Sequence, residues 1–130
     1  KAKIEKKRML RKMEKKIFDE CIEGLLEYGK QFRETKEYEK TWQKDFHDVF
    51  PSIENDEIKV YCNRKDVHSM KLYVSEHLAN KHVDIIADEE IIGGFILADV
   101  KAGSQFDLTI QGKIMASREK IGNMLMQSLT

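Results

Sequence analysis

The feature that most constrains the fold of this chain is a run of mostly apolar residues from Ile91 to Val100. The run is too short to span a bilayer, and its β-branched residues favour a strand. An apolar strand of this kind is typical of a position buried on both faces, so we expect other elements to cover each face. Gly93 and Gly94 have no Cβ atoms, which predicts a bulge or a close approach by another backbone or helix in mid-strand.

A hairpin is the simplest continuation of this strand. Lys101 to Gln105 (K-A-G-S-Q) favours a turn, and Phe106 to Ile110 alternates apolar and polar residues. That alternation is typical of the return strand of a β-hairpin. We therefore place the hairpin at the centre of the fold, with the surrounding helices as its cover.

The N-terminal residues predict one long helix. Apolar residues recur every three or four positions between Ile4 and Phe32, and no proline interrupts them. Such a helix extends roughly 45 Å, which is longer than the rest of a chain of this size can bury. Its apolar stripe is narrow before Met13, as in a coiled coil, so we expect residues 1–34 to form a stalk that pairs with a partner helix. The predicted seam residues are Leu10, Met13, Ile17, Cys21 and Leu25.

Residues 35–130 predict a globular domain. Alternating patterns predict short strands at Glu57–Cys62 and His82–Ala87, and a final helix is expected after Thr109. With the long first helix, this order gives the α+β class: a coiled-coil stalk followed by a small mixed β-sheet packed by helices.

Two further helices are expected around these strands. Thr35 is a candidate N-cap for the first, which Pro51 ends. Asn63 is a candidate N-cap for the second, with Asp66 at its third position near the positive end of the helix dipole and an end near Asn80-Lys81. The apolar stripes of the three globular-domain helices are Tyr38, Trp42, Phe46, Val49 and Phe50, then Val67, Met70, Val74 and Leu78, then Ile110, Ile114, Ile121 and Leu125.

The charge is distributed unevenly. The chain of 130 residues has no net charge, yet Lys1 to Lys16 holds nine basic and two acidic residues, a net charge of +7. A basic arm of this kind suits nucleic acid, an anionic membrane or an acidic partner. No aromatic residue precedes Phe18, however, so a solvated helix surface explains the arm better than nucleic-acid binding does.

Motifs for catalysis are missing from the sequence. Gly112-Lys113 lacks the earlier glycine of a phosphate-binding loop, because Asp107 stands at that position. Gly93-Gly94 lies inside a predicted strand, which does not fit a dinucleotide fingerprint, and the four histidines lack tight ligand spacing. We therefore expect no enzymatic activity, no cofactor, and no catalytic, cofactor-binding or metal-binding residues.

The cysteines and the hydropathy pattern bear on the compartment. Cys21 and Cys62 lie far apart and outside any paired framework, which favours reduced thiols in the cytoplasm. The sequence has neither a signal peptide nor an apolar run long enough to cross a membrane. Because the chain starts at Lys1 within a helical pattern, we expect it to be a fragment of a longer protein.

Several short motifs together resemble one known family, the E-type subunits of V/A-type ATPases. They cover the C-terminal domain of that family and part of its N-terminal stalk helix. The delta subunit of F-type ATP synthases has a similar Gly-Gly-Phe hairpin. The motifs are E-I-I-G-G-F-I-L-A-D at Glu90–Asp99, Asp107 and Thr109 before the last helix, Glu37-Tyr38 at a helix start, and Arg64-Lys65-Asp66 between strand and helix.

Two positions depart from the family pattern. Leu108 stands between Asp107 and Thr109 where the family has asparagine. Ala116 to Lys120 reads A-S-R-E-K in place of the family's Arg-Leu-Glu-Arg. These departures concern the start and the middle of the final helix, and the rest of the pattern extends over nearly the whole chain.

The resemblance implies a non-catalytic peripheral-stalk (stator) subunit. It would link the catalytic head of a rotary ATPase to the membrane sector and resist rotation during ATP hydrolysis or synthesis and ion transport. The implied partners are a G-type stalk helix, in a heterodimeric coiled coil, and the N-terminal β-barrel of a B-type head subunit. No nucleic acid is implied, and the cytoplasmic protein meets the membrane only through the complex. Loops on a rigid sheet usually present binding residues, so we expect the head to dock on the hairpin turn and on the final helix. The expected docking residues are Lys101 and Gln105 in the turn and Lys113 in the helix.

Two other function classes remain open. A non-catalytic adaptor would use the basic helix to bind an acidic partner, a membrane surface or nucleic acid. Its binding would weaken steeply with salt, whereas a coiled-coil seam would persist. A small enzyme would use the acidic residues Asp88 to Glu90 or a cysteine, although the sequence shows no base for such a nucleophile.

Overall fold

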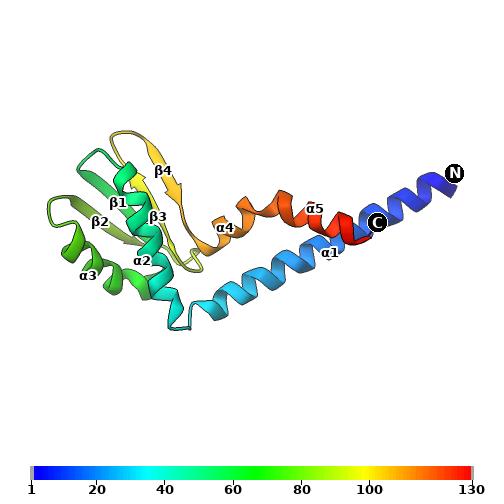
Figure 1. The fold of residues 1–130 in the computed structure, drawn as a ribbon, viewed down its shortest axis with the longest axis horizontal. Coiled ribbons are helices and arrows are strands. Elements are labelled where there is room, and N and C mark those ends of the chain that lie inside the picture. Colours follow the sequence, from blue (N-terminus) through cyan, green and yellow to red (C-terminus); the bar gives the residue numbers. More distant parts are fainter. Residues whose placement is uncertain (1, 130) are drawn as a thin grey trace.

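The fold consists of a long helix, a four-stranded mixed sheet with two covering helices, and two helices that return along the first (Figure 1). A computed structural model describes residues 2–129. The expected α+β architecture with a long N-terminal helix is confirmed. The elements in chain order are α1 (Ala2–Phe32), α2 (Glu37–Val49), η1 (Phe50–Ser52), β1 (Glu57–Cys62), η2 (Arg64–Asp66), α3 (Val67–His77), β2 (His82–Ala87), β3 (Phe95–Asp99), β4 (Ser104–Asp107), α4 (Ile110–Ala116) and α5 (Arg118–Leu129).

The sheet has the strand order β2-β1-β3-β4. The strands β1 and β2 are parallel and are joined by the crossover helix α3, as parallel neighbours require. The strand β3 pairs antiparallel with β1 and with β4, so the predicted hairpin is confirmed. The predicted bounds of its return strand are wrong, because β4 covers Ser104–Asp107 and Ile110 already belongs to α4. The strands expected at Glu57–Cys62 and His82–Ala87 are found with those bounds.

The central strand β3 is shorter than the apolar run that predicted it. Residues 91–94 form a loop, and the strand begins only at Phe95. Gly94 has a φ of +76°, and a Cβ atom there would meet the backbone carbonyl oxygen of Leu108 and lie 2.9 Å from the Cα atom of Thr109. The predicted mid-strand position of the glycines is therefore wrong. The predicted close approach of another backbone is confirmed.

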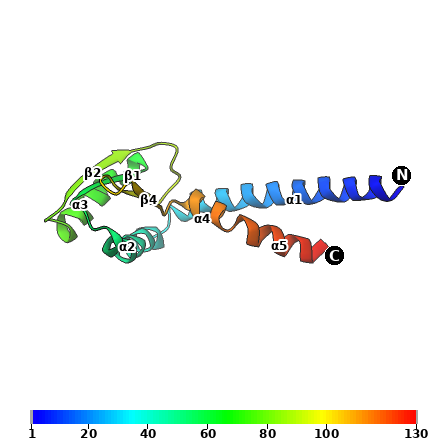
Figure 2. The same ribbon diagram turned by 90° about the horizontal axis from the view of Figure 1, so that it is seen from above.

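One face of the sheet packs against α2 and α3 and forms the core (Figure 2). The aromatic stripe of α2 faces this core, because Tyr38, Trp42 and Phe46 are all buried. The Phe46 ring lies 5.0 Å from the Phe95 ring between centroids, which joins α2 to β3. Burying an aliphatic or Phe side chain contributes about 1.5–3 kcal/mol. The largest fully buried side chains are Phe46, Phe95, Ile58, Met70, Leu97 and Val60.

No helix within residues 2–129 covers the opposite face of the sheet (Figure 2). The register places Tyr61 of β1 between Ile86 of β2 and Ile96 of β3, and all three side chains are partly exposed. We expected cover on both faces of the apolar strand, and that expectation is wrong. The sheet instead follows the half-buried alternation of β1, in which Ile58 and Val60 face the core.

The C-terminal helices run back beside α1, in the opposite direction (Figures 1 and 2). The Thr109 side chain caps α4 by accepting a hydrogen bond from the Gly112 N–H at 2.9 Å. The predicted single final helix is interrupted at Ser117, which divides it into α4 and α5. The Ser117 N–H is shared between the carbonyl groups of Lys113 and Ile114, a three-centre arrangement common where a helix ends.

Three predicted helix boundaries need correction or refinement. The Thr35 hydroxyl donates to the Phe32 carbonyl at 2.7 Å, so it satisfies the end of α1 and is not the N-cap of α2. Asn63 does act as a cap, since its side chain accepts from the Lys65 N–H at 3.0 Å, but it opens the short helix η2 before α3. The helix α3 ends at His77 because Leu78 leaves helical geometry, three residues before the predicted end.

Substitution of Gly94 tests the close approach between this loop and the backbone of Leu108 and Thr109. Gly94→Ala should lower the free energy of unfolding by at least about 2 kcal/mol more than Gly103→Ala does. Both glycines have positive φ, but a Cβ atom at Gly103 meets nothing within 4 Å. Gly103→Ala therefore reports the backbone cost alone, about 1–2 kcal/mol. Urea denaturation measures both, and equal losses would show that Gly94 is not crowded.

Candidate functional site

A buried ion pair connects the end of α1 to the sheet domain. Arg33 directly follows α1, and its Nη1 and Nη2 atoms each donate to the Asp66 carboxylate at 2.7 Å. The two side chains are only 10% and 8% exposed. A two-pronged contact of this type fixes orientation as well as distance, because both hydrogen bonds must form together.

Further hydrogen bonds extend this ion pair to two other segments. The Tyr38 hydroxyl, in the first turn of α2, donates to Asp66 at 2.8 Å and accepts from the Gly94 N–H at 2.7 Å. Arg33 Nη1 also donates to the Ile92 carbonyl at 3.2 Å. We call these five residues, Arg33, Tyr38, Asp66, Ile92 and Gly94, the joint. The joint ties α1, α2, η2 and the loop before β3 to one another.

Sequence reasoning placed Asp66 at the third position of a helix that Asn63 caps, and it did not identify Arg33. The structure confirms that position in η2 and adds that Asp66 is buried and pairs with Arg33, 33 positions away. No local pattern reports a contact over that separation. The signal that pointed to Asp66 was its place in the Arg64-Lys65-Asp66 motif of the family resemblance.

Two side chains of the joint, Arg33 and Tyr38, keep their protons at neutral pH. Burial opposes the charge of Arg33, but the hydrogen bond and charge of Asp66 outweigh it, so the Arg33 pKa lies above its ordinary value. Burial raises the pKa of Tyr38 well above the ordinary phenol value, which keeps its hydroxyl proton in place. Both groups therefore remain hydrogen-bond donors, which suits the joint to holding elements together.

Two features are absent from the described part of the chain. Residues 2–129 contain no cluster of three or more histidine, cysteine, aspartate or glutamate side chains that could hold a metal ion. Within the same range, no helix combines the length and apolarity needed to span a bilayer.

The side of α1 that faces α4 and α5 is one apolar surface of this helix. Gly29 is buried there, and a Cβ atom on it would meet Ile110 of α4. The Arg118 guanidinium of α5 lies over the Phe18 ring, 5.6 Å from its centroid. Leu25 lines a cavity of about 230 Å³ together with Ile110 and other residues of α1 and α4. The chain therefore covers this side of α1 itself.

A second apolar surface of α1 remains exposed. Leu10 is 47% exposed and Met13 is 53% exposed, while Ile17 and Cys21 are partly exposed. These four seam residues recur at three- and four-residue steps and share one side of the helix. Leu25 differs from them, since it lies at the border with the surface that α4 covers. The structure thus brings four of the five seam residues together on an uncovered stripe.

The structure separates the three residues expected at the docking surface. Lys101 and Gln105 are exposed near the turn between β3 and β4, at the end of the sheet far from α1 (Figure 1). Lys113 lies on α4 and forms an ion pair with Asp45 of α2. The three residues therefore do not form one patch, and docking by them stays a prediction. The division of the chain into two domains at residue 34 also stays a prediction.

Comparison with known proteins points in the same direction as the motifs. No family model matches the chain. The E-type subunit number 2 of the V-type ATP synthase of Clostridium tetani (strain Massachusetts / E88) is 27% identical over 124 residues, which cover 94% of this chain and 61% of that protein. The chain thus spans about three fifths of the length of the curated relative it matches. This similarity suggests the family of E-type subunits and agrees with membership of a V-type ATPase complex.

Removal of one partner from the buried Arg33–Asp66 pair should destabilise the fold far more than removal of one partner from an exposed ion pair. Arg33→Met should lower the free energy of unfolding by about 3–5 kcal/mol, because it leaves the Asp66 charge buried without its partner. Arg64→Met is the control. Arg64 pairs with Glu89 at 3.5 Å with both side chains more than 70% exposed, so its loss should stay within about 0.5 kcal/mol.

A double-mutant cycle separates the pair from its surroundings. Arg33→Met with Asp66→Leu should be more stable than the sum of the two single losses implies, with a coupling of about 2 kcal/mol or more. Urea denaturation of the four proteins measures the coupling. Additive losses would show that the two side chains act independently.

Alkaline pH should destabilise the fold partly through Cys62. Burial, assisted by the Asp66 charge, raises the pKa of this thiol from 9.0 to about 11. The folded state therefore retains a proton that the unfolded state loses. The associated stability is present below pH 9 and is lost as the pH rises to 11, by roughly 2–3 kcal/mol in all. Urea denaturation in reducing buffer from pH 8 to 11 measures this loss. The free energy of unfolding should fall less steeply with pH for Cys62→Ala than for the native chain, and equal slopes would contradict the role of Cys62.

Proposed function

We propose that this chain is a peripheral-stalk (stator) subunit of a V/A-type rotary ATPase. The observation that carries the proposal is the combination of the rigid joint with the uncovered stripe of seam residues on α1. A stator must transmit torque between the head and the membrane sector without yielding, and it needs no active site to do so. The likeness to the E-type subunit of a V-type ATP synthase supports the same role.

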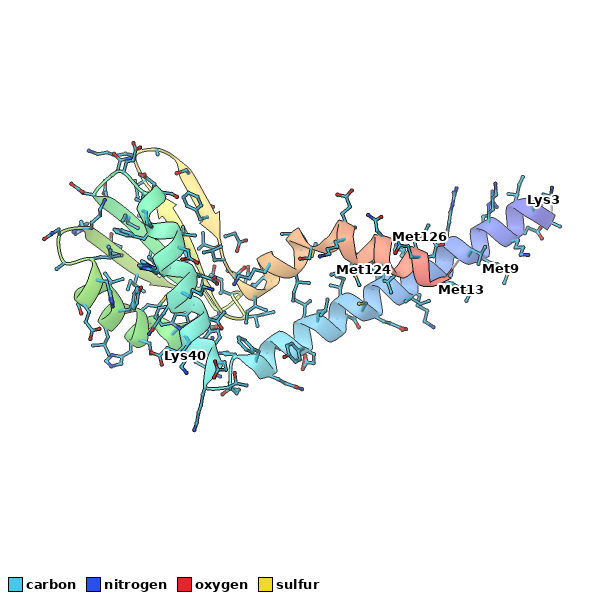
Figure 3. All side chains as sticks on the ribbon, in the orientation of Figure 1. Lys3, Met9, Met13, Lys40, Met124 and Met126 are labelled. Carbon is cyan, nitrogen blue, oxygen red and sulfur yellow. The ribbon has the colours of Figure 1, made fainter. Side chains whose placement is uncertain are left out.

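The first partner in this proposal is a G-type stalk helix. It would pair with α1 along Leu10, Met13, Ile17 and Cys21, the stripe that α4 and α5 leave open. Figure 3 shows Met9 and Met13 on α1, with Met9 on the stretch that extends past the end of α5. Exposed apolar residues in a repeating stripe are stabilised when a second helix covers them.

The second partner is the N-terminal β-barrel of a B-type head subunit. The β3–β4 turn and the start of β4 are the better candidate for this contact, because Lys101 is exposed in the turn and Gln105 is exposed on β4. Bonds to both neighbouring strands hold β3 in place. Lys113 is a weaker candidate, since its charge is already paired with Asp45. In the working complex the chain would lie in the cytoplasm and reach the membrane only through other subunits.

Reconstituted complexes test the mechanical role. Met13→Asp should weaken partner-helix pairing, because it places a charge in the seam, and Lys101→Glu should weaken head docking. Each should reduce ion transport while ATP hydrolysis by the head continues, since a loosened stator lets the head turn without coupling. Lys12→Asp is the control for the first variant, because Lys12 is an exposed residue of α1 outside the seam.

Each variant is first checked for native circular dichroism. Full ion transport by complexes in which the partner helix is shown to have dissociated would contradict the stator proposal. ATP hydrolysis by the purified chain alone would also be inconsistent with it. Normal transport and assembly with Lys101→Glu would remove only the β3–β4 turn from the docking surface.

A further inference from the structure

The outer edge of β2 is a free strand edge. The strand β2 ends the sheet, and no strand within residues 2–129 pairs on its other side. The N–H groups of His82 and Asp88 both donate at 2.8 Å toward the β1 side, to Asp56 and Cys62. Backbone groups alternate in direction along a strand, so those of Val83 and Ile85 point away from β1 and out of the sheet.

A groove lies beside this edge, between α3 and β2. Its volume is about 340 Å³. Val74 and Leu78 of the α3 side and Val83 and Ile85 of β2 supply its apolar lining, and the exposed Ser75 is also part of it. The free backbone groups and the apolar groove therefore lie next to each other, the arrangement that strand-adding peptide sites use.

The edge lacks three of the common protections against strand addition. Natural edges are commonly shortened, bulged or interrupted by proline. The other edge strand, β4, has only four residues, whereas β2 has six and keeps an unbroken register with β1 from His82 to Ala87. The side chains of His82 and Asp84 on β2 are well exposed and do not line the groove.

We propose that an extended segment of a partner protein adds to β2 as a fifth strand. Its backbone would bond to the N–H and C=O groups of Val83 and Ile85. Residues two positions apart on a strand are separated by about 6.7 Å and point to the same face. Alternate side chains of the segment would therefore enter the groove and must be apolar. The site does not depend on the stator role, and any partner with such a segment qualifies.

The charge of the groove specifies one more property of the segment. The lining contains Lys71 and Lys81 and no acidic residue. Lys81 is occupied, since it donates to the Asn55 carbonyl at 2.9 Å and lies 3.6 Å from Asp56. Lys71 is exposed on α3, beside the later part of β2, because α3 runs antiparallel to the strand that follows it. The segment should carry an acidic residue at the end that lies near Ile85.

Two soluble model peptides test this site. Both alternate valine and threonine, and a pair of glutamates stands at each end of one, whereas a pair of lysines stands at each end of the other. We expect the acidic peptide to bind with a dissociation constant below about 1 mM, and at least about fivefold more tightly than the basic one, because only glutamates are attracted to Lys71 in either strand direction. Amide hydrogen exchange followed by NMR should slow about tenfold at Val83 and Ile85 on binding.

Matched variants locate the contact. Ser75→Trp fills the groove from an exposed position and should weaken binding by about tenfold. Glu76→Trp, the next residue along α3, lines a different cavity and should leave binding unchanged. The exchange measurement on the native chain needs no variant, so it stands even if Ser75→Trp fails to fold.

Three results would overturn the proposal. The first is no binding of either peptide up to about 1 mM. The second is binding without protection of Val83 and Ile85, or binding that survives Ser75→Trp. The third is a peptide-free chain that sediments as a dimer with these two amides already protected, because the edge would then belong to a second copy of the chain.

Discussion

The ion pair between Arg33 and Asp66 determines how the long helix leaves the sheet. Apolar contacts alone are nearly non-directional, so they would hold α1 near the sheet without fixing its angle. The guanidinium and carboxylate groups add direction, because both of their hydrogen bonds at 2.7 Å fail if the helix rotates. The surrounding donors and acceptors complete the arrangement. No buried side-chain nitrogen or oxygen in the described residues lacks a hydrogen bond.

Two glycines make room for the second connection between α1 and the rest of the chain. Ile110, the first residue of α4, packs against Gly29 of α1 and Gly93 of the loop, and its N–H donates to the Gly93 carbonyl at 3.0 Å. A Cβ atom at either glycine would collide with the Ile110 side chain. The isoleucine thus occupies the space that the glycines leave, and it holds α4 beside the joint.

Local patterns in the sequence predicted most of the elements, and long-range contacts account for the errors. Alternation in Glu57–Cys62 and the aromatic stripe of α2 reflect burial within one element, so they could be read directly. The start of β3 could not be predicted from the local sequence, because the approach of Leu108 to Gly94 determines where the strand begins. The pairing of Arg33 with Asp66 joins residues that share no local motif. Leu25 was assigned to the seam because its spacing fits both sides of α1, and only the position of α4 distinguishes them.

The side-by-side, antiparallel course of α1 and α5 has an elastic consequence. A sideways force at the N-terminal end of α1 produces its greatest bending moment at the joint. There the cross-section contains two helices, α1 with α4 or α5, whereas the first turns of α1 extend past the end of α5 as a single rod (Figure 2). Two adhering rods resist bending much more than one does, as in a tapered cantilever. Under load, the two-helix section near Arg33 would therefore bend less than a single helix would, which spares the geometry of the joint.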